Sequence, residues 1–180
     1  MTAELEVPGT VRVPVSVLVE RRPGATPWAE WSWRAAEVLE DAPDLPPWTV
    51  LREEAGRTLF LAGRAEVALH PTDTPNYREN LQSGTPRVWA VLREAEAPPG
   101  LRLYTVTVDG GEAHLYAESG TDLLESLAMP AGVRAVAEAF VARHHVERAF
   151  HKRQRDRADP EAMARGRGGG RRRPAPEDDE

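Results

Sequence analysis

The sequence predicts an α+β fold, built on a curved, mostly antiparallel sheet of about six strands, with two short helices and a C-terminal helix. Three observations predict it. Segments with alternating apolar residues are joined by short turns rich in glycine and proline. The regular strand and helix alternation of a parallel nucleotide-binding sheet is missing. The last apolar segment follows the helical period instead. We expect one domain over residues 11–157 and a disordered, charged tail over residues 158–180.

The first predicted strand is "VRVPVSVLVE", residues 11–20, whose valines alternate with other residues. The alternating valines are Val11, Val13, Val15, Val17 and Val19. This period of two predicts one buried face. Pro14 has no N–H to donate, so we expect it at an edge or in the first residues of the strand. "WSWRAAEVLE" alternates Trp31, Trp33 and Ala35 and predicts a second strand; an amphipathic helix over residues 29–40 is the alternative.

The middle of the chain predicts a hairpin followed by a short helix. "WTVLREE" and "TLFLAGRAEVALH" flank a tight turn, and Gly63 within the second arm indicates a bulge. In "HPTDTPNYRENLQSG", Thr74 is the expected cap of a helix that begins at Pro75 and closes at Gly84.

"PRVWAVLRE" and "LRLYTVTVD" predict another hairpin, "EAHLYAESG" a short helix and "TDLLESLAMP" a last strand. From Pro130 the apolar residues follow the spacing of an amphipathic helix, which we expect to run to about Arg153. Its predicted buried face consists of Val133, Val136, Ala137, Phe140, Val141 and His144.

Composition excludes several classes of function. The absence of cysteine removes disulfides, thiolate metal sites and cysteine nucleophiles. The first ten residues lack the basic and apolar regions of a signal peptide, and no apolar run approaches the roughly 20 residues of a membrane span. We therefore expect a cytoplasmic protein with no membrane partner. The net charge is −6, yet the stretch after Ala142 is rich in arginine, so the rest of the chain is acidic.

The stretch "ARHHVERAFHKRQRDR", residues 142–157, is the most unusual in the chain. On a helix, His144 and His151 would stand about 10 Å apart along the axis, too far to share one metal ion, so we expect no metal site. Of the 23 basic residues only Lys152 is not arginine, and Phe150 is the one aromatic residue among the charges. Nucleic-acid binding is therefore not expected, because the aromatic stacking platform is missing.

Two further groups of residues are candidates for binding. Four of the five tryptophans, Trp28, Trp31, Trp33 and Trp48, predict core packing or, as the alternative, a recognition surface. A hydrogen-bonded trio of His70, Tyr77 and Asn80 could hold a polar ligand or, as the alternative, cap the short helix. The chain has no phosphate-binding loop, nucleophile elbow or zinc-protease motif.

Taken together, "PWAEWSWR", "PWTVLREE", "HPTDTPNYRENL", "PRVWAVLRE", "VTVDGGEAHLYAESG" and "FVARHHVERAFHKRQRDR" resemble a bacterial domain-of-unknown-function family, number thirty-three-oh-five (DUF3305). The resemblance covers about residues 11–157. Members are commonly encoded near molybdenum-dependent formate dehydrogenases, so the resemblance implies a role in the maturation or operation of a molybdoenzyme. It implies no catalytic residues.

Two hypotheses follow. The first is a non-catalytic accessory protein that contacts a formate dehydrogenase subunit or its maturation factor and needs no cofactor. Its expected contact residues are His144, His145, Val146, Phe150, Lys152, Arg153 and Arg155, with Val146 and Phe150 as an apolar anchor on one helix face. The alternative is a small enzyme or carrier for a molybdopterin-type or other anionic ligand, which would use His70, His144, Lys152 and Arg153.

Overall fold

The computed structural model describes residues 8–26 and 28–146. The strands are β1 (Val11–Pro23), β2 (Trp31–Leu39), β3 (Thr49–Glu54), β4 (Arg57–Leu69), β5 (Arg87–Glu94), β6 (Leu101–Thr107) and β7 (Asp122–Ala128). The helices are the single turn η1 (Pro71–Asp73), α1 (Thr74–Gln82), α2 (Gly110–Ser119) and α3 (Ala131–His144). The predicted α+β class is confirmed. The predicted domain end at Arg157 and the predicted tail lie outside the described residues.

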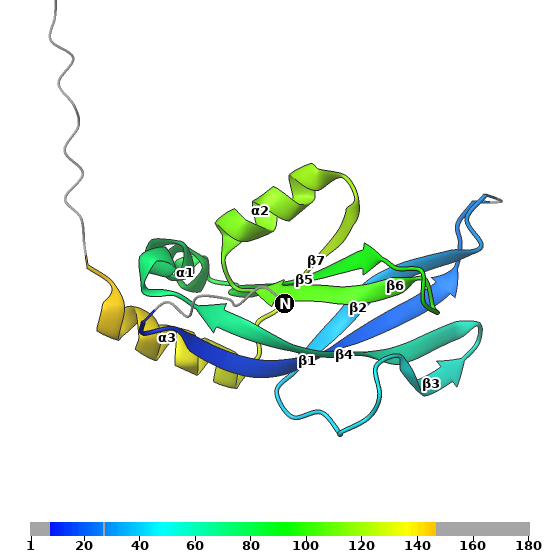
Figure 1. Ribbon diagram of the computed structural model, residues 1–180, viewed down its shortest axis with the longest axis horizontal. Helices are drawn as coiled ribbons and strands as arrows, with labels where there is room; N and C mark the ends of the chain where they lie inside the picture. Colours follow the sequence, from blue (N-terminus) through cyan, green and yellow to red (C-terminus); the bar gives the residue numbers. More distant parts are fainter. Residues whose placement is uncertain (1–7, 27, 147–180) are drawn as a thin grey trace, which may run out of the picture. The chain divides into compact units, whose positions relative to one another are not determined.

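The strands form one curved sheet in the order β2-β1-β4-β6-β5-β7, with β3 paired to β4 as well (Figure 1). Every pairing is antiparallel except that of β4 with β6. The two end strands of this order, β2 and β7, also lie close to each other, so the sheet is nearly closed. Helices α1 and α3 lie together at one end of the sheet (Figure 1).

Strand β1 is buried more completely than its alternation predicts. Val15, Val17 and Val19 belong to the core, as expected. Ser16 and Leu18 between them are buried too, at 3% and 7% exposure, so the prediction of one buried face is wrong for the strand centre. Because β1 lies between β2 and β4, side chains of both neighbouring strands flank Ser16 and Leu18 on the second face. Pro14 precedes the first pair with β2, at Ser16, as its missing N–H requires.

The predicted β3 and β4 hairpin is confirmed. Its turn residues Ala55 and Gly56 have positive φ angles of 46° and 78°, as a tight hairpin turn requires. Gly63 has a φ of 147° and lies at a shift in the register between β1 and β4. The bulge expected at Gly63 is therefore present, and it bends the longest strand pair of the sheet.

Helix α1 begins differently from the prediction. It starts at Thr74 with Asp73 as its N-cap, and the Thr74 hydroxyl donates to the carbonyl oxygen of Pro71 at 3.2 Å instead of capping the helix. Because the 3-10 turn η1 leads directly into α1, Thr74 already has helical backbone angles. Gly84, with a φ of 81°, follows the C-cap Ser83, as predicted for the helix end.

Helix α3 packs on the sheet and its start is capped from a distant segment. Val133, Ala137 and Phe140 are its buried residues, whereas Val136 is exposed, in contrast to the prediction. The Glu40 carboxylate accepts a hydrogen bond of 2.6 Å from the Val133 N–H, so a residue just after β2 satisfies one of the free donors at the helix start.

Candidate functional site

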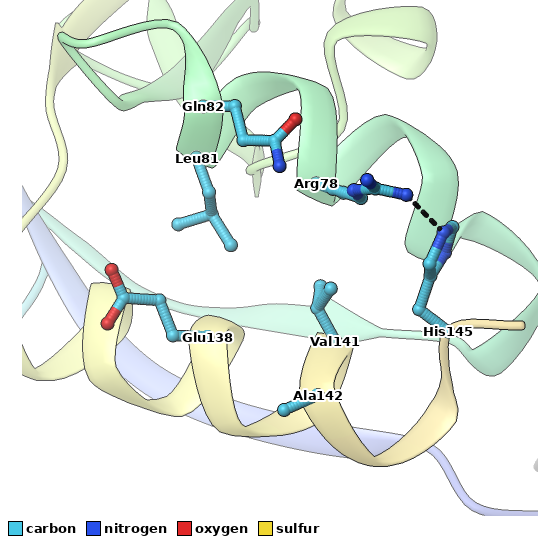
Figure 2. A pocket seen from close by; sticks show the side chains of 7 residues that line it. All are labelled: Arg78, Leu81, Gln82, Glu138, Val141, Ala142 and His145. Carbon is cyan, nitrogen blue, oxygen red and sulfur yellow. Dashed lines mark hydrogen bonds between the residues drawn. The ribbon is translucent and has the colours of Figure 1, made fainter. Parts of the chain in front are cut away.

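A groove of about 420 Å³ lies between α1 and α3 (Figure 2). Its lining residues are Arg78, Leu81, Gln82, Glu138, Val141, Ala142 and His145. Leu81 and Val141 point into it from opposite helices, and the hydrogen-bonded pair of Arg78 and His145 closes one end (Figure 2). The groove therefore has an apolar middle and polar ends, as sites for protein segments commonly have.

The two helices turn their buried faces to the core and leave the groove between them. Helix α1 buries Thr74, Tyr77 and Asn80, which leaves Arg78 and Leu81 on its flank. The rings of Tyr77 and Phe140 meet edge to face, with centroids 6.3 Å apart, and connect α1 with α3 beneath the groove. Both walls of the groove are thus held by core contacts.

His145 does not continue helix α3. Its backbone is extended, with φ −74° and ψ 122°, and its Nε2 lies 3.0 Å from Nη1 of Arg78. Its Nδ1 lies 3.4 Å from the Thr74 hydroxyl. The expected continuous helix to Arg153 is therefore wrong at this point. The helix ends here as the His145 side chain contacts Arg78 and Thr74 of α1.

The expected contact residues divide into two sets. His144 is half-buried and its ring lies 4.6 Å from that of Phe140, while the Val146 side chain is 76% exposed. Val146 is not helical, so the helix face that it was expected to share with Phe150 does not extend to it. Of the three expected residues that the structure describes, only His145 lines the groove. The remainder, Phe150, Lys152, Arg153 and Arg155, lie outside the described residues.

His70 and Tyr77 line a second cavity, of about 390 Å³. The His70 N–H donates to the Tyr77 hydroxyl at 3.1 Å, and Nδ1 of His70 lies 3.1 Å from the Thr10 hydroxyl. Burial raises the pKa of Tyr77 to about 12. Burial, together with the nearby Glu112 carboxylate, does the same for Tyr116 on the same wall. These tyrosines stay neutral near pH 7.

The carboxylates of this second cavity outnumber its basic side chains. Glu66, Asp73 and Glu112 line it, together with Arg12. Glu112 accepts hydrogen bonds from Thr107 at 2.6 Å and from Tyr116 at 3.2 Å. Such a lining disfavours an anionic ligand, because carboxylates repel it.

Asn80, the third member of the predicted trio, turns away from His70 and Tyr77. Its amide nitrogen donates to the carbonyl oxygens of Arg87 at 2.7 Å and Val108 at 2.9 Å, and its amide oxygen accepts from the Arg87 N–H at 2.9 Å. The structure thus unites His70 with Tyr77 but joins Asn80 to the backbone of β5 and of the segment after β6.

The four tryptophans considered for binding divide into a packed pair and an exposed pair. Trp33 and Trp48 contact each other edge to face, with centroids 5.9 Å apart, and both contact Phe60. Trp28 is 95% exposed, while Trp31 is 39% exposed and stacks under the Arg21 guanidinium at 4.2 Å. The first pair packs against the core, and the second pair is available at the surface.

Sequence reasoning missed most of the groove, because its walls come from helices far apart in the chain. Leu81 offered a signal, as an apolar residue within the mostly polar sequence of α1. Over residues 8–26 and 28–146, no group of three or more histidine, aspartate and glutamate side chains is arranged to hold a metal ion. Nor is any helix in this part of the chain long and apolar enough to cross a membrane.

Comparison with curated proteins and with solved structures finds no match. A family described as "Protein of unknown function (DUF3305)" matches residues 14–154, which is most of the chain. The match includes β1 from Pro14 onward, all the later strands and helices of the described residues, and both walls of the groove. The chain therefore belongs to the DUF3305 family.

Proposed function

We propose that this protein is a non-catalytic accessory protein, which supports the maturation or operation of a molybdoenzyme such as a formate dehydrogenase by direct protein contact. The groove between α1 and α3 is the proposed contact site. Its open, apolar middle is the observation that carries the proposal, because apolar side chains held at the surface between two helices commonly bind a protein segment.

The occupant that fits this groove is an amphipathic segment of the partner with acidic side chains at one end. Leu81 and Val141 offer apolar contact in the middle. Arg78 stands at the end where α3 terminates. By sequence, the chain that follows Val146 adds further basic residues, among them Lys152 and Arg153. The positive charge of Arg78 at this end of the groove favours encounter with an acidic partner and helps to fix its orientation.

The alternative, a small enzyme or carrier for a molybdopterin-type or other anionic ligand, requires a different site from the one predicted around His70. The carboxylates of the His70 cavity disfavour an anion. The accessory protein is therefore better supported than a carrier that binds its anionic ligand at His70.

The test uses full-length protein as bait in lysate of the native host, with Ala142→Glu as the groove variant. Ala142 is exposed and lines the groove, so the new carboxylate repels the acidic partner without disturbing the core. Ala139→Glu is the matched control, because Ala139 is exposed on the same helix and does not line the groove. Mass spectrometry identifies the retained proteins.

We expect the parent protein and the control to retain a dehydrogenase subunit or maturation factor, and the groove variant to lose most of it. The retained protein is then purified and its affinity for all three forms measured. Equal affinity of the groove variant and the control refutes the proposed contact site. Retention of no such protein by any bait, with a nucleotide or pterin bound to the purified chain, supports the carrier alternative instead.

A further inference from the structure

Four arginines converge on a cavity of about 560 Å³ that is separate from the groove. Each comes from a different strand: Arg22 from β1, Arg34 from β2, Arg52 from β3 and Arg57 from β4. They are distant in the sequence and meet because β1 pairs with β2 and β4, and β3 pairs with β4. We call this cavity the arginine pocket.

One carboxylate organises three of these guanidinium groups. Glu20 accepts hydrogen bonds from Arg22 at 2.7 Å and from Arg34 at 3.2 Å. Arg57 approaches its other oxygen at 3.9 Å. The Glu20 side chain is only 13% exposed, and its hydrogen bond with Arg22 lowers its pKa. A single, ionised carboxylate therefore holds several cations in place without neutralising them all.

Donors remain available in the pocket after these contacts. Arg22 uses Nη2 and Arg34 uses Nε to reach Glu20, so each guanidinium keeps further N–H groups. Arg52 forms no ion pair with any residue of the described part of the chain. Glu37 and Glu54 also line the pocket, which leaves the four arginines one charge in excess of its three carboxylates.

We propose that the arginine pocket binds the phosphoryl group of a small phosphorylated molecule. The forked guanidinium group matches the oxygens of a phosphate, and a phosphate with two negative charges attracts these arginines more strongly than the single charge of Glu20 does. The pocket volume is within the range of small-molecule sites. Glu37 and Glu54 on its lining disfavour a long polyanion such as a nucleic acid, because an extended chain of charges would have to pass close to them.

A purely structural ion network explains Arg22 and Arg34 but not the whole set. The Arg57 side chain is 61% exposed and its contact with Glu20 is long, so it adds little to folding stability. Arg52 lies on β3 with every residue from 51 to 57 exposed. Two exposed cations that add little to folding stability, placed beside an organised pair, are consistent with a ligand site.

The experiment titrates the full chain with inorganic pyrophosphate at low salt in a calorimeter. Arg57→Gln and Arg52→Gln remove one pocket cation each. Arg64→Gln is the matched control, because Arg64 lies on the same strand as Arg57, is 58% exposed and pairs with Asp44 outside the pocket. We expect saturable binding that is about tenfold weaker in each pocket variant, the effect of one lost charge-assisted hydrogen bond. The control is expected to bind as the parent protein does.

Glu20→Gln tests whether the arginines of the pocket bind a ligand or only form a structural ion network with Glu20. Removal of the competing carboxylate is expected to tighten pyrophosphate binding several-fold, provided that thermal unfolding shows a folded protein. Should that variant not fold, the two arginine variants decide alone. Ala142→Glu is expected to leave pyrophosphate binding unchanged. The proposal for the arginine pocket is therefore tested independently of the proposal for the groove between α1 and α3.

Three results would overturn the proposal. One is the absence of saturable binding. Another is binding that Arg57→Gln and Arg52→Gln do not weaken, which places the anion elsewhere, for example on the arginine-rich sequence after Val146. The third is equal or tighter binding of citrate or of an acidic peptide with the same dependence on the two arginines, because the preferred ligand is then a polycarboxylate or a protein segment.

Discussion

Replacement of Asn80 by alanine tests whether its amide is a structural bridge. The side chain is 8% exposed and makes three hydrogen bonds of 2.7 to 2.9 Å to backbone groups of Arg87 and Val108. Each bond contributes about 1 kcal/mol, and a buried group left unpaired costs about 1–3 kcal/mol. We therefore expect Asn80→Ala to reduce the free energy of unfolding by about 3 kcal/mol, with a range of about 2–5 kcal/mol.

The assay is urea unfolding of the full chain, followed by tryptophan fluorescence. With a denaturant slope of about 2 kcal/mol/M, the expected loss lowers the midpoint by about 1.5 M. Glu79→Ala is the control, because Glu79 is exposed on the same helix and its side chain has no hydrogen bond or ion pair within the described residues. We expect the control to lose less than about 1 kcal/mol.

Asn80→Asp sharpens the test. The aspartate keeps an acceptor for the Arg87 N–H but directs a second oxygen toward two carbonyl oxygens, which repel it. We expect it to destabilise at least as much as alanine near pH 7 and to recover part of the loss when acid protonates it. A urea midpoint for Asn80→Ala that equals that of the parent protein within error refutes the structural role of the Asn80 amide. A role of Asn80 in binding is then the alternative.

Three further predictions concern stability. Burial raises the pKa of Glu125, so its ionisation opposes folding; Glu125→Gln is expected to be more stable than the parent at about pH 7 and equal to it at about pH 4 in urea unfolding. Asp122 accepts hydrogen bonds from Arg93 at 2.6 and 2.7 Å, and these bonds lower its pKa. The ionised Asp122 therefore stabilises the fold at pH values above the ordinary pKa of aspartate, and this contribution is lost as the pH falls through the lowered pKa. Thermal melts against pH should show a shallower acid-side decline for Asp122→Asn. Loss of the Glu40 cap on the Val133 N–H should cost about 1 kcal/mol in Glu40→Ala, and no change in its unfolding midpoint would contradict the capping role.

The groove and the arginine pocket suggest a division of tasks within one small domain. The groove is formed by two helices at one end of the sheet, and the pocket by four strands of the sheet itself. A phosphorylated ligand bound by β1 to β4 would not occupy the proposed protein contact. If both proposals hold, the affinity of the partner protein in the presence and absence of the ligand measures whether the two sites are coupled.

The sequence by itself determined the elements whose causes are local. Alternating apolar residues predicted the strands, the "AGR" turn predicted the β3 and β4 hairpin, and Gly63 predicted the bulge in β4. These features depend on side-chain periodicity and on backbone angles favoured by glycine. The family resemblance likewise needed only the order of the sequence blocks.

Only the tertiary structure decided the features that depend on packing between distant segments. It ended α3 at His144, because His145 contacts Arg78 and Thr74 on α1 rather than continuing the helix. It separated Asn80 from His70 and gathered the four arginines around one carboxylate. Periodicity reports which face of an element is apolar but not which other element covers that face, and both candidate sites depend on this second choice.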